Sequence, residues 1–243
     1  MKLPALLPGQ RTGDTMFSKV YARIKQWERS WKSSFGTDIS TPEGRQAARR
    51  HNNLVDHAFL RRILPNRYQL SDEAWRSNQP DPVHFPALQK IGIRSVINLR
   101  GPDRFSYYLF EKEACTDYGM ALYNHELFAR VLGSPKDYLD LLDLMETVEK
   151  PMLIHCKSGA DRTGIAAALY LLDQKGADID AARAQLSLKY AHQRWSKAGI
   201  LDHLLDTYAI HCETNPITVR DWLANHYDPE AVSASFHAKR SKG

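Results

Sequence analysis

The chain has 243 residues, of which 43% are hydrophobic and 25% charged, so its composition is that of an ordinary globular protein and excludes a disordered or fibrous chain. Its longest apolar runs fall short of the ~18 residues that cross a bilayer, and its three cysteines have no Cys-x-x-Cys spacing, which argues against a disulfide framework or a zinc knuckle. The net charge of +5 arises in the first 70 residues, which hold 13 Lys and Arg against 5 Asp and Glu. We therefore expect a cytoplasmic protein with reduced thiols, one main domain and a basic N-terminal extension.

Residues 17–32 have the pattern of an amphipathic helix. Apolar side chains recur there at steps of three and four residues, namely Phe17, Val20, Tyr21, Ile24, Trp27 and Trp31. Lys and Arg fill the positions between them, so the helix would have one apolar and one basic face. Such a helix fits two roles, docking on the body of the protein or lying on an anionic membrane surface, and the sequence leaves both open. A second helix is predicted to begin at Pro42, with Thr41 as its N-cap.

From residue 68 onward, short apolar segments alternate with longer amphipathic ones. Strands are predicted near residues 68–70, 74–77, 94–99, 120–125 and 151–155. Helices are predicted from Asp81, at 105–118, and from Ser134 to about residue 149. Strands separated by helices of this length form crossover units, so the predicted fold class is α/β, with a mostly parallel central sheet flanked by helices.

The C-terminal part of the chain is predicted to be helical. An Ala- and Leu-rich helix follows the last strand and ends at Gly176, and further helices are predicted at 178–191, 197–211 and 216–226, before a charged tail. We therefore divide the chain into three parts. These are a basic helical N-terminal extension (1–67), an α/β core (68–190) and a C-terminal helical extension packed on the core (191–243).

The stretch LIHCKSGADRTG, residues 153–164, places a cysteine at the end of a predicted strand and an arginine six positions later. Ligand sites of parallel sheets lie beyond the carboxyl ends of their strands. The loop from Lys157 to Asp161 is short, and Gly159 allows it to curl so that its amide groups converge on one point. The helix that starts near Arg162 adds the positive end of its dipole. The loop is therefore predicted to bind an oxyanion.

Cys156, at the base of this loop, is the predicted nucleophile. The amide groups, the helix dipole and the charge of Arg162 all favour its thiolate. The guanidinium of Arg162 can hold two phosphoryl oxygens in a bidentate fork, and the hydroxyl of Thr163 can donate a hydrogen bond to the sulfur. Attack of the sulfur on phosphorus would give a phosphocysteine that water then hydrolyses. The predicted chemistry is phosphomonoester hydrolysis, with no metal and no cofactor.

The segment HCKSGADRTG resembles the signature loop of the cysteine-dependent protein tyrosine and dual-specificity phosphatases. The preceding segment, WRSNQPDPVHFPALQKIGIRSVINLRG, is similar to the opening of the compact bacterial and fungal branch of that superfamily. The resemblance covers about residues 68–190 and implies a tyrosine phosphatase-like fold. It implies that Cys156 is the nucleophile, that Arg162 clamps the phosphate and that His155 orders the loop. The phosphate-binding loop residues are then Lys157, Ser158, Gly159, Ala160, Thr163 and Gly164.

The general acid has more than one candidate. The superfamily usually takes it from an Asp on a Trp-Pro-Asp loop before the Cys, and this chain has no such loop. Asp117 precedes a predicted strand, which places it at the wrong end of the sheet, whereas His125 and Glu126 follow that strand and lie at the correct end. Asp161 is the other candidate, because lipid-active relatives with a similar loop use an Asp at the matching position. Asp161 could equally anchor the loop amides, and a phenolic leaving group would need the least help.

The predicted substrate is a phosphotyrosine- or phosphoserine-type protein. The alternative is a phospholipid or phosphoinositide, reached by a contact of residues 17–32 with an anionic membrane. Lys157 fits that alternative, but Ala160 stands where lipid-active loops often carry a second Lys. A module that only binds phosphate or docks on a membrane is the non-enzymatic alternative, and no nucleic acid partner is expected. Sulfur or arsenate chemistry would need a further reactive thiol, and neither Cys115 nor Cys212 is predicted near the loop.

Five other positions receive structural interpretations. Arg100 and Asp103 follow the strand predicted at 94–99 and are expected either to line the cleft or to form a loop salt bridge. His203, His211 and Cys212 lie on one predicted C-terminal helix, but their spacing fits no familiar metal site.

Overall fold

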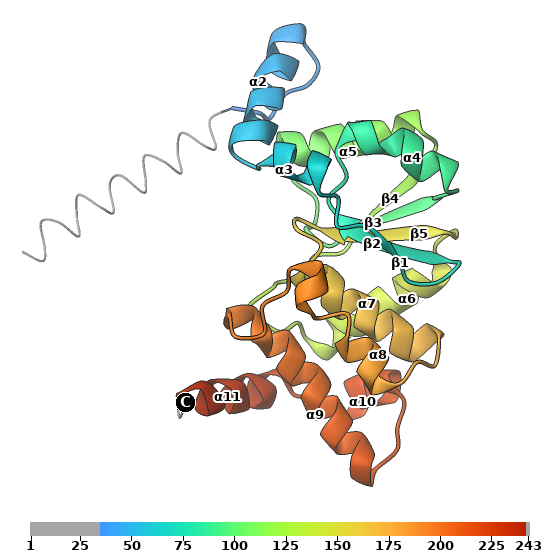
Figure 1. The fold of residues 1–243 in the computed structure, drawn as a ribbon, viewed down its shortest axis with the longest axis vertical. Coiled ribbons are helices and arrows are strands. Elements are labelled where there is room, and N and C mark those ends of the chain that lie inside the picture. The colour runs from blue at the N-terminus through green and yellow to red at the C-terminus, as the bar shows by residue number, and fades with distance from the viewer. Residues whose placement is uncertain (1–34, 242–243) are drawn as a thin grey trace, which may run out of the picture.

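A five-stranded sheet lies at the centre of the computed structural model, which describes residues 35–241 (Figure 1). The strand order is β1-β2-β5-β3-β4; β1 pairs antiparallel with β2, and the other neighbours pair in parallel. The strands are β1 (Tyr68–Gln69), β2 (Ala74–Asn78), β3 (Ser95–Asn98), β4 (Ala121–Asn124) and β5 (Met152–Cys156). Their ends lie within one residue of the predicted strands. The predicted α/β class and the mostly parallel sheet are therefore confirmed.

β5 occupies the middle of the sheet, and its side chains are buried on both faces. Met152, Leu153, Ile154 and Cys156 are all at most 2% exposed, as expected of a strand covered by helices on each side. β2 and β3 flank β5, and the register places Cys156 beside Asn78 of β2. The carboxyl ends of these three strands therefore meet at one edge of the sheet.

Helices cover both faces of the sheet (Figure 1). α4 (Phe85–Lys90) and α5 (Ser106–Asp117) lie on one face, and α6 (Pro135–Thr147) and α7 (Asp161–Gln174) lie on the other. The face with α4 and α5 buries Phe85, Leu88, Ile93, Val96, Ala114, Cys115, Met120 and Leu153. The larger core on the opposite face continues through α6 and α7 to the C-terminal helices.

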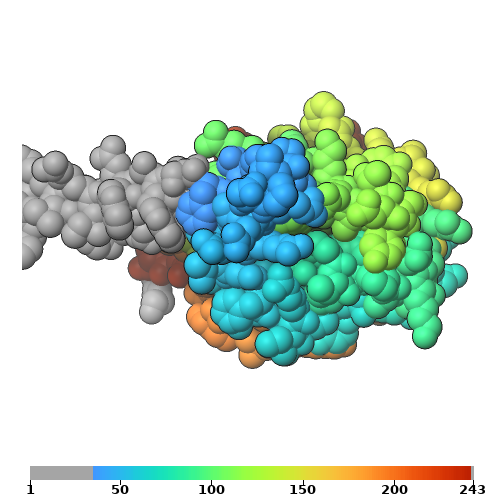
Figure 2. Space-filling view, turned by 90° about the horizontal axis from the view of Figure 1, so that it is seen from above, coloured from blue at the N-terminus to red at the C-terminus, as the bar shows by residue number. Residues whose placement is uncertain are grey.

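The described part of the N-terminal segment packs on α5. α2 (Pro42–Leu54) begins as predicted after Thr41, whose hydroxyl accepts a hydrogen bond from the backbone N–H of Gly44. Arg45 of α2 pairs with Glu113 of α5, and Figure 2 shows the blue N-terminal segment against the green surface of the core. α3 (Ala58–Ile63) has no counterpart among the predicted elements. The helix predicted at 17–32 lies outside the described residues.

The C-terminal helices form the outer layer on the α7 side. They are α8 (Ile179–Arg183), α9 (Ile200–Thr214), α10 (Val219–Asn225) and α11 (Pro229–Arg240). α10 contacts α6 and α7, whereas α8 contacts α7 and α9. The charged tail predicted after residue 226 is wrong, because α11 starts at an Asp228 cap and buries Val232 and Phe236 on its contact with α9. Its charged residues Glu230, Lys239 and Arg240 lie at exposed positions before and after those two side chains.

The helix predicted at 178–191 is also wrong in its second half. α8 stops at Arg183, and a 3-10 turn, η2 (Leu188–Tyr190), follows before Ala191 with a φ of 64°. At this turn the Tyr190 carbonyl accepts a hydrogen bond from Asn66, and just after it His192 contacts Asp161 at the start of α7.

Candidate active site

Cys156 is the last residue of β5 and lies at the base of the loop that leads into α7. The loop comprises residues 157–160, and α7 begins at Asp161. The Cys156 side chain is only 2% exposed. Arg162 and Thr163 lie in the first turn of α7, so the predicted nucleophile, loop and phosphate clamp share one edge of the sheet.

Gly159 lets the loop lie directly on the end of β2. Its φ is 74°, and a Cβ at this position would lie 2.6 Å from the backbone N of Asn78 and 2.7 Å from the backbone C and O of Ser77. Real Cβ atoms do not approach backbone so closely, and side chains rarely adopt this φ. The loop conformation therefore requires glycine at position 159.

The other loop residues are arranged around this glycine. Ser158 is exposed, and its hydroxyl accepts a hydrogen bond from the Ala160 backbone N–H at 3.4 Å. The Ala160 carbonyl accepts the first intrahelical bond of α7 from Gly164 at 3.0 Å. A Cβ on Gly164 would lie 2.9 Å from the carbonyl oxygen of Gln185, so α7 starts in close contact with the turn after α8.

Arg162 reaches across the carboxyl edge of the sheet. Its Nη1 lies 3.4 Å from the carbonyl oxygen of Leu99, after β3, and 3.5 Å from that of Leu127, after β4. Both contacts are long for hydrogen bonds, so the guanidinium keeps donors for an oxyanion. Thr163 is fully buried, and its hydroxyl has no hydrogen-bond partner among residues 35–241.

A buried acid supports His155 beneath the loop. Nε2 of His155 lies 2.8 Å from Oε1 of Glu111, and both side chains are completely buried. Oε2 of Glu111 accepts a hydrogen bond from the Gln79 side chain at 2.7 Å. The backbone N–H of Gln79 donates in turn to the Lys157 carbonyl at 3.4 Å. The turn after β2 therefore contacts the loop through Gln79, and Glu111 connects this turn to His155.

Asp56 gathers three cations beside the loop, which the sequence did not reveal. Its carboxylate lies 2.7 Å from Arg61, 3.0 Å from Arg100 and 3.1 Å from Lys157. Burial alone would raise the pKa of Asp56, but the charges of Arg100, Arg61 and Lys157 outweigh it and hold the pKa below its usual value. Of the two expected roles, Arg100 therefore has the salt bridge. Asp103 accepts a hydrogen bond from the Tyr107 hydroxyl.

Asn66 joins the N-terminal segment to two parts of the site. Its side-chain amide donates to the Ser158 carbonyl at 2.9 Å and to the Tyr190 carbonyl at 3.0 Å. One side chain therefore ties the phosphate-binding loop to the turn after α8.

Arg76 places a buried positive charge under the loop. Its guanidinium donates to the Gly159 carbonyl at 2.8 Å and to the Gln185 carbonyl at 2.9 Å, and it stacks 3.6 Å from the ring centre of Tyr190. Burial lowers the pKa of Arg76 to about 10, and the charges of Tyr190 and Cys156 limit the fall. The guanidinium therefore stays protonated at neutral pH.

Asp161 is held by a histidine that the sequence did not connect with it. Its Oδ1 lies 2.7 Å from Nδ1 of His192, whose Nε2 lies 2.7 Å from Oδ2 of Asp202. Burial would lower the pKa of His192, but its hydrogen bonds to Asp161 and Asp202 outweigh this and raise the pKa to about 9.

His125 and Glu126, the other acid candidates, follow β4 at the same edge of the sheet. They line a pocket of about 350 Å³ with Leu127, whose carbonyl also faces Arg162. Nε2 of His125 is buried and has no hydrogen-bond partner among residues 35–241. Both residues therefore remain candidates beside Arg162. Asp117 ends α5 before β4, so it lies at the opposite edge of the sheet, as predicted.

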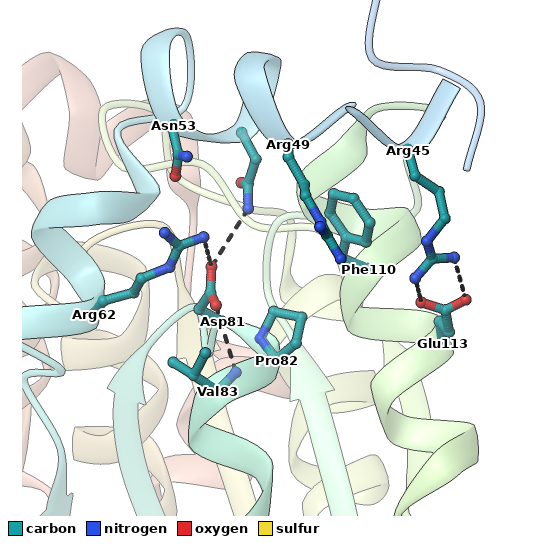
Figure 3. A pocket seen from close by; sticks show the side chains of 10 residues that line it. Arg45, Arg49, Asn53, Arg62, Asp81, Pro82, Val83, Phe110 and Glu113 are labelled. Carbon is teal, nitrogen blue, oxygen red and sulfur yellow. Dashed lines mark hydrogen bonds and ion pairs between the residues drawn. The ribbon is translucent and has the colours of Figure 1, made fainter. Parts of the chain in front are cut away.

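A second pocket, of about 360 Å³, lies between α2 and α5 (Figure 3). Arg45 in this pocket pairs with Glu113 at 2.7 Å, and Arg62 pairs with Asp81 at 3.0 Å, while Arg49 extends towards Phe110. Two of its arginines are thus already neutralised, and none of the residues 155–164 lines it.

Cys115, Cys212 and His203 have contacts outside the loop after β5. Cys115 is buried on the α5 side of the sheet, and burial raises the pKa of its thiol. Cys212 lies on α9, where its sulfur faces the Ile217 carbonyl. His203 bonds Ser235 of α11 at 2.6 Å.

Part of the chain is similar to known phosphatases. Residues 71–184 match the model of a family described as the tyrosine phosphatase family. One relative is OCA1 of Mycosarcoma maydis, which is named as a tyrosine-protein phosphatase. It is 30% identical over 105 residues, or 41% of this chain and 65% of that protein. The dual specificity protein phosphatase TpbA of Pseudomonas aeruginosa is 27% identical over 131 residues, or 50% of this chain and 53% of TpbA. The chain therefore spans between half and two thirds of the length of these curated relatives.

The crystal structure of TpbA has a similar fold. It matches with a TM-score of 0.52 and 20% sequence identity, over 67% of this chain and 93% of the TpbA chain.

Proposed function

We propose that the protein is a cysteine-dependent phosphatase that hydrolyses phosphomonoesters through a phosphocysteine, because residues 71–184 match the model of the tyrosine phosphatase family. The observation that carries the proposal is the position of Cys156, at the end of the central strand, below a glycine-dependent loop and next to Arg162 in the first turn of α7. This arrangement pairs a sulfur nucleophile with an oxyanion site.

The reaction would proceed in two displacements. The thiolate of Cys156 attacks phosphorus, an S–P bond forms, and the P–O bond to the leaving group breaks as that oxygen takes a proton. Arg162 and the loop amides stabilise the charge that spreads over the equatorial phosphoryl oxygens. Water then attacks phosphorus, the S–P bond breaks, and inorganic phosphate leaves with the thiolate restored.

The substrate we propose is a phosphorylated protein, with phosphotyrosine ahead of phosphoserine. Since the side chain of Cys156 is only 2% exposed, a phosphate must extend into the site to meet the sulfur. The ring of phosphotyrosine carries its phosphate farther from the peptide backbone than the short side chain of phosphoserine does. Phenolate is also the leaving group that needs the least help from an acid.

A phospholipid substrate at a membrane surface is the second candidate. Phe59, Leu60, Ile63 and Leu64, on or just after α3, are between 47% and 76% exposed, and the same segment contributes Asn66 to the site. Exposed apolar groups of this kind can insert into a headgroup layer. No helix among residues 35–241 is both long and apolar enough to cross a membrane.

Phosphate release from several substrates tests the proposal. The purified protein and its Cys156→Ser variant would be given an aryl phosphate, phosphotyrosine and phosphoserine peptides, and phospholipid monoesters in vesicles. We expect turnover of the aryl phosphate and the phosphotyrosine peptide by the wild type alone, unaffected by EDTA. Preference for vesicles that is lost on deleting residues 1–33 would favour the lipid candidate, and turnover by Cys156→Ser would exclude the phosphocysteine. Binding of phosphate without any turnover would leave the non-enzymatic alternative.

A further inference from the structure

His192 is a buried imidazole placed between carboxylates from two different helices. The residue is 1% exposed, and each of its ring nitrogens lies 2.7 Å from one carboxylate oxygen. Asp161 begins α7, directly before Arg162, and Asp202 lies in the first turn of α9. The ring therefore connects the start of the phosphate-binding helix to the C-terminal helices.

The backbone before His192 is bent in a way that aims the ring. Ala191 has a φ of 64°, a conformation that residues with a Cβ rarely adopt. The N–H of His192 donates to the Ser187 carbonyl at 3.1 Å, which closes the turn. Unfavourable backbone geometry of this kind persists where surrounding contacts enforce it, and it often occurs near functional sites.

The charges around the ring favour its protonated form. Asp161 faces it from α7 and Asp202 faces it from α9. Arg194 lies 4.0 Å from the other carboxylate oxygen of Asp202 and pairs with Asp206 at 2.5 Å. Both ring nitrogens can donate only if the imidazole is charged. The pKa of about 9 that these hydrogen bonds give His192 agrees with this geometry.

We infer that His192 is a positioning residue of the phosphate-binding loop, whose charged ring holds Asp161 as an ionised anchor and leaves it without the proton that a general acid must give. The inference deepens the phosphatase function proposed above and rests on it. Asp161 then fixes the start of α7 and, with it, the side chain of Arg162. The proton for the leaving group comes from another group, for which His125 and Glu126 are placed at the same edge of the sheet.

Leaving-group dependence separates an anchor from an acid. An acid at position 161 would matter most for an alkyl phosphate and little for p-nitrophenyl phosphate, whereas an anchor matters equally for both. We expect Asp161→Asn and His192→Gln each to lower kcat/KM about tenfold on both substrates. The double variant should show no further loss, because both substitutions remove the same contact between His192 and Asp161. His203→Gln is the matched control, because His203 is a buried imidazole that bonds Ser235 of α11, and it should retain full activity.

The pH profile gives a readout that a merely structural histidine would not move. Wild-type kcat/KM should fall as the pH rises through about 9, where His192 loses its proton, and His192→Gln should lack that step. A loss in Asp161→Asn confined to the alkyl phosphate, or full activity in His192→Gln, would overturn the inference. Asp202→Asn serves as a second variant if His192→Gln does not fold, and it should shift the step to lower pH.

Two measurements do not depend on turnover, so the inference and the phosphatase function can fail separately. The imidazole signal of His192 in NMR spectra of the full chain, assigned with His192→Gln, should titrate near pH 9, and a midpoint near 6.5 would contradict the inference. Tungstate affinity of Cys156→Ser should fall about tenfold when His192→Gln is added, because the clamp loses its anchor. If the wild type hydrolyses no substrate, the phosphatase function fails, and these two results still decide the role of His192.

Discussion

The carboxylate of Asp56 lies 3.1 Å from Nζ of Lys157, so a residue of the N-terminal segment neutralises a cation of the phosphate-binding loop. The same carboxylate contacts Arg61 and Arg100, and it is only 4% exposed at its side chain. The loop is thus supported by a group that lies outside the segment matched by the family model.

Asp56→Asn should strongly destabilise the protein. The substitution leaves Lys157, Arg61 and Arg100 close together without their common anion, and removing one partner from a buried ion pair typically costs about 3–5 kcal/mol. Urea denaturation should show this loss in the free energy of unfolding. Asp140→Asn is the control, since Asp140 forms an exposed pair with Lys136 and its replacement should change the stability little. An equal effect of both substitutions would contradict the importance given to the Asp56 cluster.

Gly159→Ala should strongly reduce activity and destabilise the protein. The added methyl group would meet the backbone of Asn78 and Ser77 at 2.6 to 2.7 Å, so either the loop or the end of β2 must move. We expect kcat/KM to fall at least about a hundredfold, because the loop amides lose their convergence on the phosphate. Gly176→Ala is the matched control: its φ is 60°, but nothing lies within 4 Å of the added Cβ, so activity should be kept. A Gly159→Ala variant with normal turnover would show that the loop tolerates the displacement.

Arg162→Lys should reduce turnover much more than substrate binding. Lysine keeps the positive charge but loses the planar fork that fits two phosphoryl oxygens, so the loss should appear mainly in kcat, by about a hundredfold. Steady-state kinetics with an aryl phosphate would measure it. Arg220→Lys is the control, because Arg220 also makes paired contacts, with Asp173, but at the opposite end of α7 from Arg162. Unchanged kcat in Arg162→Lys would remove Arg162 from the clamp role.

Local sequence patterns predicted the elements that build the site. Alternating apolar segments located all five strands, and the caps Thr41 and Ser134 located the starts of α2 and α6. The spacing of Cys156 and Arg162 indicated the strand, loop and helix because these three elements are contiguous in the chain. The roles of the site residues and the division at residues 67/68 and 190/191 stay predictions.

The supporting residues could not be predicted because distant segments bring them together. Asp56, Asn66 and His192 reach the loop from segments that are separate from it in the chain, and no local pattern marks them. The contact of His192 with Asp161 could not be expected from the helix predicted at 178–191, because a continuous helix has no turn at Ala191. Arg76 offered one signal, because an arginine inside a buried strand needs a specific partner.

Stability should fall as the pH rises from neutral into the alkaline range. The pKa of His192 is raised in the folded state from 6.5 to about 9, so its contribution is fully present below pH 6.5 and is lost as the pH passes 9. A rise of this size corresponds to roughly 3 kcal/mol. Denaturation of the wild type and His192→Gln at pH 7 and pH 10 would test this, and the pH dependence should be smaller in the variant. If the free energy of unfolding depends equally on pH in both proteins, the pH dependence belongs to another group.

Asn66→Gly should weaken the site while leaving most of the fold intact. Asn66 has a φ of 45°, which glycine adopts without strain, so the substitution removes the side-chain amide without disturbing the backbone. The Ser158 and Tyr190 carbonyls then lose their common donor, and each hydrogen bond of this kind contributes about 1 kcal/mol. We expect weaker tungstate binding by Cys156→Ser and a lower kcat/KM, measured by calorimetry and by phosphate release. Asn225→Gly is the control for a lost side-chain bond, because Asn225 donates only to the Asp221 carbonyl on α10, and its replacement should affect stability alone. Equal oxyanion affinities in the two variants would show that the N-terminal segment does not support the loop.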